Sequence, residues 1–192
     1  MSTPKIAIIV GSTRPERFAD TAVEWFHGIA ATYDEAAFEV VDLRDYPLPF
    51  FDETAPVAAK PPEHEVAKKW EAKLAEFDGF VFSVAEYNHG MTAVLKNALD
   101  YAYQAWSRKP VAFLGYGGVG GARAVEQVRM VTSQLQMAPL SGGVAITMPE
   151  MMAVGKGEKQ LSDYDYLNDA AKATLDDLLW WTKALKSARE AS

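Results

Sequence analysis

The 192-residue sequence contains no cysteine. Disulfides, thiolate metal sites and cysteine nucleophiles are therefore excluded, and the composition suits a reducing compartment, so we expect a cytoplasmic protein. Histidine is also scarce. The three residues present, His27, His64 and His89, do not have the spacing of metal ligands. The sequence therefore predicts no zinc or iron site.

Long apolar runs and an excess of basic charge are missing as well. The apolar run at 6–10 is too short to span a bilayer, and no signal-like pattern accompanies it, so we expect no membrane span. The formal net charge of −7 offers no basic field for nucleic acid or an anionic membrane. What remains is an ordinary globular composition, and the length favours a single domain over residues 1–192.

Strand and helix patterns alternate along the chain. Short apolar runs predict five buried strands, at 6–10, 38–43, 79–84, 111–114 and 142–146. Amphipathic or helix-forming stretches lie between and after them, at 18–29, 63–76, 92–103, 122–135 and 161–189, while 44–62 and 148–159 are expected to be irregular. This alternation predicts a three-layer, doubly wound α/β fold with a parallel sheet. Ligands of such sheets bind beyond the carboxyl ends of the strands.

The loop after the first strand is rich in groups that bind anions. It reads Gly11-Ser12-Thr13-Arg14-Pro15-Glu16-Arg17 and leads into a helix. Unpaired N–H groups at a helix N-terminus favour an anion, the two hydroxyls add donors, and Arg14 and Arg17 offer guanidinium forks. We predict a phosphate-binding loop. The alternative is simple helix capping beside two surface arginines.

Two further loops are expected at the same edge of the sheet. The loop at 85–91 carries Glu86 and His89, but the sequence shows no partner that would complete a catalytic triad. The loop at 115–121 matches G-x-G-x-x-G, yet it follows the fourth strand and lacks the ribose-binding acid about 20 residues later. Close backbone approach to a flat ligand is favoured over a classical NAD site or a flexible turn. The chain is thus predicted to hold a phosphorylated planar cofactor that brings its own chemistry, without a catalytic side chain.

Three motifs together resemble the NADPH-dependent FMN reductase family, a flavodoxin-like group that includes quinone, chromate and azo-dye reductases. They are the loop at 11–17, Glu86-Tyr87-Asn88 followed by 95–101, and the stretch 117–123. The joint order of three motifs is more specific than any one of them. The resemblance implies a flavodoxin-like five-stranded parallel sheet of order 2-1-3-4-5, FMN as cofactor, and NADPH or NADH as reductant.

The resemblance also implies which residues bind FMN. The phosphate is expected on the first loop, and the isoalloxazine ring between the second and third loops. The expected contacts are Gly11, Ser12, Thr13, Arg14, Arg17, Phe18, Ala85, Glu86, Tyr87, Asn88, Tyr116, Gly117 and Gly118. Ala85 stands where the family usually has proline, so the second loop lacks that source of rigidity.

The implied activity passes electrons from NADPH through bound FMN to a quinone or similar small acceptor by a ping-pong route. A flavodoxin-type electron carrier and a ligand-sensing protein without turnover are the alternatives. The helix at 92–106 has an apolar arc wider than one sheet-facing stripe needs, with Leu99 on the second stripe. Tyr46, Phe50 and Phe51 add apolar area, for a partner or for the chain's own core. We therefore expect a homodimer or homotetramer, with Leu99 facing the partner.

Overall fold

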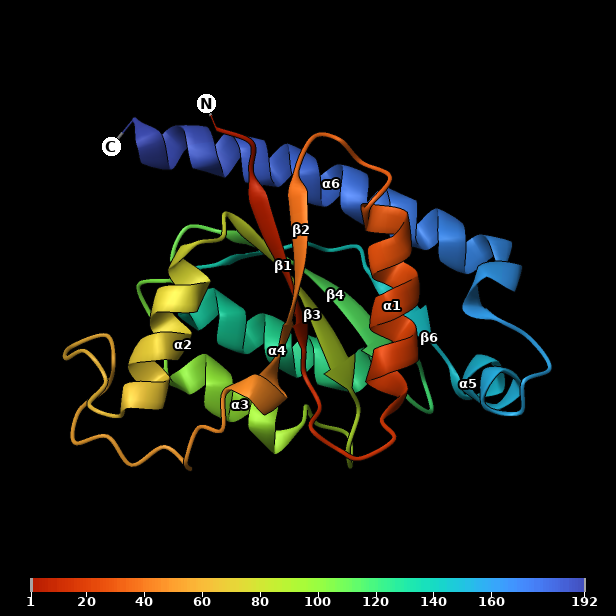
Figure 1. Cartoon of the computed structure of the whole chain (residues 1–192), viewed down its shortest axis with the longest axis horizontal. Coiled ribbons are helices and arrows are strands. Elements are labelled where there is room, and N and C mark those ends of the chain that lie inside the picture. The colour runs from red at the N-terminus through yellow and green to blue at the C-terminus, as the bar shows by residue number, and fades with distance from the viewer. Residues whose placement is uncertain (1, 192) are drawn as a thin grey trace.

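The computed structural model describes residues 2–191 and is built around one parallel sheet (Figure 1). Its strands are β1 (Lys5–Val10), β2 (Ala37–Asp42), β3 (Gly79–Ala85), β4 (Pro110–Tyr116), β5 (Ala138–Pro139) and β6 (Val144–Ile146). The order is β2-β1-β3-β4-β5, and β6 also pairs with β4. The flavodoxin-like order 2-1-3-4-5 is confirmed.

The fifth position of the sheet is shared by two short strands, where the sequence predicts one. β5 pairs with the first residues of β4, and β6 pairs with its last three. Pro139 has no N–H to give to the ladder, so an edge strand is interrupted there. Gly143 then passes so close to β4 that a Cβ on it would lie 2.8 Å from the Phe113 carbonyl oxygen.

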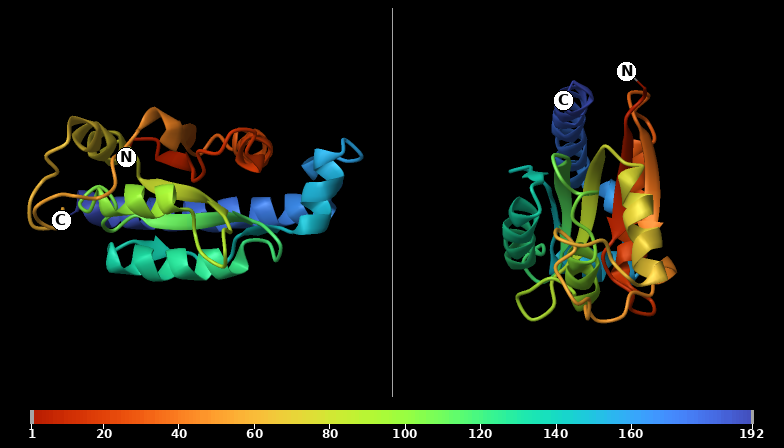
Figure 2. Two further views of the ribbon diagram at one scale, coloured as in Figure 1. Left: turned by 90° about the horizontal axis from the view of Figure 1, so that it is seen from below. Right: turned by 90° about the vertical axis from the view of Figure 1, so that its left-hand side faces the viewer.

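Within residues 2–191, six helices accompany the sheet: α1 (Phe18–Ala30), α2 (Glu65–Ala75), α3 (Ala93–Asp100), α4 (Ala122–Gln134), α5 (Met148–Gly155) and α6 (Asp165–Glu190). Of the short 3-10 turns, η1 (Leu43–Asp45) precedes the long connection to α2, and η2 (Leu161–Asp163) comes directly before α6. The apolar faces of α1 and α6 pack on one face of the sheet, and those of α2, α3 and α4 pack on the other. In Figures 1 and 2 the segment between η1 and α2 forms a wide peripheral loop at the end of the molecule opposite α5.

The central strands are buried along their whole length. Every residue of β3 and β4 is buried, because helices cover both faces of the sheet there. β2 lies at the edge and is mostly exposed or half-buried. The strands β1, β3 and β4 therefore form the buried centre of the molecule, and the loops at their carboxyl ends leave the sheet from well-packed positions.

Segment 148–159 was expected to be irregular, and this expectation is wrong for residues 148–155, which form α5. α5 begins after Thr147, whose backbone N–H donates to Oε2 of Glu150 at 2.8 Å. This is the capping-box pattern T-x-x-E, and Pro149 stands in the first turn, where its missing N–H costs nothing. The sequence Thr147-x-x-Glu150 therefore carries a helix-start signal that the expectation of an irregular segment did not take into account.

The helix predicted to reach Tyr103 ends at Asp100. Thr92 caps it as expected: its hydroxyl accepts a hydrogen bond from the N–H of Leu95 at 3.1 Å and donates one to the carbonyl of Gly11. After Asp100 the chain turns back, and the ring of Trp106 packs 4.8 Å from that of Phe80. The second apolar stripe therefore belongs to the chain's own core.

The expectation that Leu99 faces a partner subunit is consequently wrong, since Leu99 is fully buried in that core. Tyr46 also packs inward, with its ring 4.9 Å from that of Trp70. Phe50 is different, because 84% of it is exposed. Asn97 holds this part of the loop in place by accepting from the N–H of Phe51 at 3.0 Å and donating to the carbonyl of Pro49 at 2.7 Å.

Candidate cofactor site

The three predicted loops converge on one cavity at the carboxyl ends of β1, β3 and β4. Its volume is about 340 Å³, within the usual range for ligand sites. Ten of the thirteen expected contacts line it: Ser12, Arg14, Arg17, Phe18, Ala85, Glu86, Tyr87, Tyr116, Gly117 and Gly118. The sequence reasoning missed Glu16, Met148 and Met151, of which the methionines come from α5, the helix it did not foresee.

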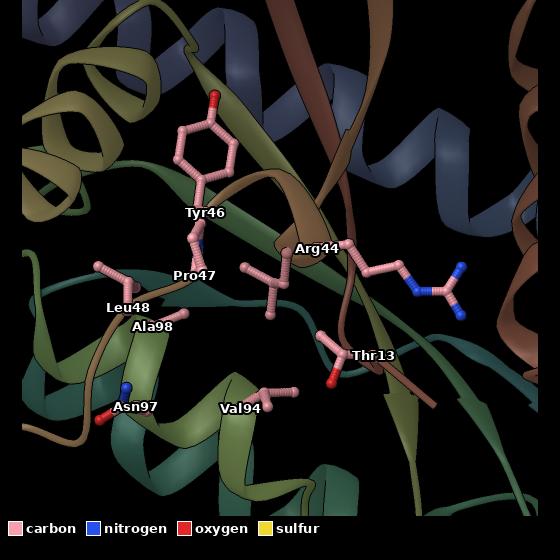
Figure 3. A pocket seen from close by; sticks show the side chains of 9 residues that line it. Thr13, Arg44, Tyr46, Pro47, Leu48, Val94, Asn97 and Ala98 are labelled. Carbon is pink, nitrogen blue, oxygen red and sulfur yellow. The ribbon is translucent and has the colours of Figure 1, made fainter. Parts of the chain in front are cut away.

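Three expected contacts lie elsewhere. Gly11, the first residue of the first loop, is buried, and a Cβ on it would meet the Ser83 carbonyl oxygen at 2.2 Å, so only glycine lets the chain pass β3 this closely. Asn88 is at the tip of the second loop. Thr13 lines a neighbouring hollow of about 330 Å³ between η1, the segment after it and α3. Figure 3 shows this mostly apolar hollow, with the Arg44 guanidinium extending away from Pro47 and Leu48.

The first loop presents the start of α1 to the cavity. Arg17 is the N-cap residue, and no side chain caps the helix, so its first N–H groups keep their capacity to bind an anion. The Ser12 hydroxyl lies 3.1 Å from the Tyr87 hydroxyl. The exposed guanidinium of Arg14 lies over the Tyr87 ring, 5.7 Å from its centre. Tyr87 is thus part of the same polar corner as the predicted phosphate loop.

The two arginines of this loop have different surroundings. The side chain of Arg17 is only 4% exposed and pairs with both oxygens of Asp42, one of them at 2.8 Å. It also donates to Asp20 at 2.7 Å and to the Ser12 carbonyl. The pKa of Arg17 is raised above its ordinary value, mainly by the hydrogen bond to Asp42. Two carboxylates therefore compensate the charge of Arg17, while Arg14 has no carboxylate at salt-bridge distance among the described ion pairs.

The second loop is a tight two-residue turn. Tyr87 and Gly90 exchange backbone hydrogen bonds of 2.8 and 3.0 Å, and Asn88 and His89 between them have positive φ angles of 51° and 71°. Glu86, at the start of the loop, forms an ion pair with Arg123 of α4. Burial alone would raise the pKa of Glu86, but Arg123 outweighs it and holds that pKa below its ordinary range. The carboxylate is thus committed to an internal partner.

Beneath the third loop, the buried hydroxyls of Tyr116 at the end of β4 and of Ser83 on the neighbouring strand β3 have no hydrogen-bond partner among the described residues. Burial raises the pKa of Tyr116 to about 12, and the nearby Ser83 hydroxyl offsets this in part, although the pair does not reach hydrogen-bond geometry. Beside them, nothing lies within 4 Å of a Cβ built on Gly118. An open wall without side chains, next to an uncapped helix N-terminus and the Arg14 guanidinium, suits a flat ligand with an anionic group, so the residues present fit a phosphorylated planar cofactor.

Within residues 2–191, no group of three or more histidine or acidic side chains is arranged to hold a metal ion. No helix of that range has both the length and the apolar character needed to cross a membrane.

The strand order and a ligand cavity at the carboxyl ends of the strands define a flavodoxin-like protein. Solved structures agree. The NAD(P)H:(acceptor) oxidoreductase FerB of Paracoccus denitrificans superposes with a TM-score of 0.68 over 94% of this chain and 98% of its own, at 19% identity. The apo form of the NADH:FMN oxidoreductase EMOB gives a TM-score of 0.68 over 92% and 90%, at 17% identity. These likenesses establish the fold.

The sequence profile of the NADPH-dependent FMN reductases matches residues 4–149, and the chain belongs to this family. An NAD(P)H-dependent FMN reductase of Schizosaccharomyces pombe is 38% identical over 151 residues, which are 77% of this chain and 74% of that one. A quinone reductase of Pseudomonas putida is 29% identical over 189 residues, 93% and 94% of the two chains. The protein is therefore an oxidoreductase of the FMN-dependent, NAD(P)H-consuming kind.

Proposed function

We propose that this enzyme passes electrons from NADPH or NADH through bound FMN to a quinone or a similar small acceptor, by a ping-pong route. The observation that carries the proposal is the single cavity in which an uncapped helix N-terminus and Arg14 face a wall without side chains at Gly118. The named activities of two relatives, the Pseudomonas putida quinone reductase and a 2-hydroxy-1,4-benzoquinone reductase of Burkholderia that is 32% identical over 156 residues, support the choice of acceptor.

The residues of the three loops divide the work of binding. We assign the FMN phosphate to the start of α1, Ser12 and Arg14, with the Tyr87 hydroxyl beside them. The ring is assigned to the space between Ala85–Tyr87 and 116–118. FMN, when bound, supplies the redox chemistry. The chain's own groups bind, orient and exclude water. None is assigned as an acid or base, because the carboxylate of Glu86 is ion-paired and the hydroxyl of Tyr116 is buried.

We further propose a homodimer, or a homotetramer, of a cytoplasmic single-domain chain. Since Leu99 is buried, the proposed contact surface is the loop at Phe50 and Phe51 instead. Phe50 is mostly exposed, although hydrogen bonds with Asn97 and Tyr101 hold its loop in place. Exposing a large apolar side chain on an ordered loop is unfavourable in water, and a partner subunit that covers it would remove this cost.

The proposal is tested by the absorption spectrum of the purified protein, followed by anaerobic titration with NADPH and steady-state kinetics with a quinone. A flavin spectrum that NADPH bleaches, and parallel double-reciprocal lines when both substrates are varied, are the expected results. A flavin spectrum that NADPH leaves unchanged would favour the electron carrier. A protein that does not bind added FMN would overturn the assignment of the cavity.

A further inference from the structure

Arg123 of α4 is bound to the second loop by an ion pair and hydrogen bonds with Glu86. The Glu86 side chain is only 3% exposed. Its Oε1 accepts from Nε of Arg123 at 2.6 Å and from Nη2 as well, and its Oε2 accepts from the Arg123 backbone N–H at 3.2 Å. The carboxylate therefore receives both the side chain of Arg123 and the first turn of α4, where an acidic group is electrostatically favoured.

The same helix supports the far side of the loop. Nη1 of Arg123 lies 2.7 Å from Nε2 of His89, and Nε2 of Gln127 donates to the His89 carbonyl at 3.1 Å. Asn88 and His89 occupy left-handed backbone conformations, which are uncommon for residues other than glycine although Asn and His adopt them more readily than most. Contacts from neighbouring elements help to hold such a turn in place. Arg123 and Gln127 of α4 provide that support. The loop begins with Ala85 and not with proline, so it lacks the backbone restriction that a proline would add.

Glu86 is also the point where the second and third loops meet. Its backbone N–H donates to the Tyr116 carbonyl at 3.1 Å. Gly117 follows with a φ of +148°, and a Cβ on it would lie 3.1 Å from the Cβ of Glu86. A shift of Glu86 would therefore change the spacing between the two walls of the cavity.

We propose that Arg123 is a positioning residue of the cofactor site: acting through Glu86, it fixes the separation of the two loops that flank the flavin ring. Arg123 itself does not line the cavity. The inference rests on the proposed function, because it assumes that FMN occupies this site.

The charge balance of Glu86 supplies a signature of this role. Arg123 holds the pKa of Glu86 down against burial, so its removal should let burial raise that pKa. His89 lies next to this ion pair, against Arg123. The other charged or titratable groups facing the cavity are Arg14, Glu16, Arg17, Tyr87 and Tyr116. Among the described ion pairs, Glu86 has Arg123 as its one partner. Without it, Glu86 at high pH is a buried charge with no counter-ion, and protonation at lower pH relieves this.

The experiment measures the FMN dissociation constant by flavin fluorescence between pH 5 and 8, for wild type, Arg123→Ala, Arg123→Lys and the double variant Arg123→Ala/Glu86→Gln. Because the FMN phosphate titrates in every sample, each value is divided by that of wild type. Arg123→Ala should weaken binding about 30-fold at pH 8, because it leaves a buried charge unpaired, and markedly less at pH 5. Arg123→Lys should recover part of the loss. The double variant should bind better than Arg123→Ala at pH 8, a coupling that independent sites do not show.

Glu126→Ala, which removes an exposed charge from the same helix, is the matched control and should bind as wild type does. Equal FMN binding by wild type and Arg123→Ala at all pH values would overturn the inference. A uniform loss, the same at pH 5 and 8 and unchanged in the double variant, would also overturn it, as a merely structural role. If Arg123→Ala does not fold, Arg123→Lys and the double variant carry the same comparison. Failure of wild type to bind FMN would instead reject the proposed function.

Discussion

The first and second loops of the site are each braced by an ion pair in which the loop's own side chain is buried and its partner is partly exposed, but the two pairs have opposite polarity. The first loop itself contributes the cation, Arg17, and its carboxylate partner is Asp42 at the end of β2. The second loop itself contributes the carboxylate, Glu86, and its cationic partner is Arg123 of α4. Each brace neutralises itself. Arg14 is then the positive group that the first loop keeps for a ligand, and the second loop offers a neutral edge.

This difference suits a ligand with two unlike ends. An anionic group gains from the uncompensated Arg14 and from the start of α1, while an uncharged ring gains from a wall that carries no net charge. Rigid, self-compensated braces also hold the loops in their binding geometry before the ligand arrives, so less binding free energy is lost to ordering them.

The largest effect is expected from breaking the first brace at its carboxylate. Asp42→Ala leaves the buried guanidinium of Arg17 with only the more exposed Asp20, and unpairing a buried charge costs about 3 kcal/mol of unfolding free energy. Urea denaturation measures the loss. Glu16→Ala, which removes an exposed charge from the same loop, should leave the unfolding free energy within about 0.5 kcal/mol. Equal stability of Asp42→Ala and wild type would show that Arg17 needs no brace.

Arg14→Ala should separate ligand binding from stability. The loss of one charge-assisted contact should weaken FMN binding by about 1.5–3 kcal/mol, or roughly 10- to 100-fold. Riboflavin, which lacks the phosphate, should bind the variant and wild type alike. Arg14→Lys should recover only part of the loss, because an ammonium does not form a bidentate fork. Parallel FMN and riboflavin titrations test this, and an equal loss for both ligands would mean that Arg14 does not contact the phosphate.

The sequence predicted the loops because each depends on local patterns: continuous apolar strands, a glycine where β1 meets β3, and donors before a helix. It did not predict the braces. Arg17 and Asp42 are 25 positions apart and Glu86 and Arg123 are 37 apart, so only the folded sheet brings them together. The prediction that Leu99 faces a partner subunit was wrong for a related reason. A wide apolar arc on a helix identifies what is buried, whereas the path of the chain after Asp100 decides what buries it.

Acid should weaken the first brace without a mutation. Burial raises the pKa of Asp42, but its contacts with Arg17 and Arg44 outweigh this and hold that pKa below its ordinary value. The stabilisation is therefore complete above the unfolded-state pKa of about 4 and is lost as pH falls through the lower folded-state pKa. In Asp42→Asn the fall in unfolding free energy below pH 4 should be shallower than in wild type. Some slope should remain, because Asp78, paired with Lys186 and Arg189, has a lowered pKa too. Identical slopes in the two proteins would contradict the brace.

The smallest effect concerns the hydroxyl that joins the two loops. The Tyr87 hydroxyl lies 3.1 Å from that of Ser12, while its ring packs under Arg14, so Tyr87→Phe removes one polar group and keeps the ring. A single hydrogen bond to a neutral group contributes about 0.5–1.5 kcal/mol, so FMN binding should weaken by roughly 2- to 12-fold. Ser12→Ala should lose a similar amount, and the double variant should lose less than the sum if both hydroxyls serve the same bound phosphate oxygen.

NADPH-quinone turnover of FMN-saturated Tyr87→Phe should stay within about tenfold of wild type, because general acid-base groups contribute about 10²- to 10⁴-fold and none is assigned here. A loss of that larger size with FMN still bound would make Tyr87 a catalytic acid.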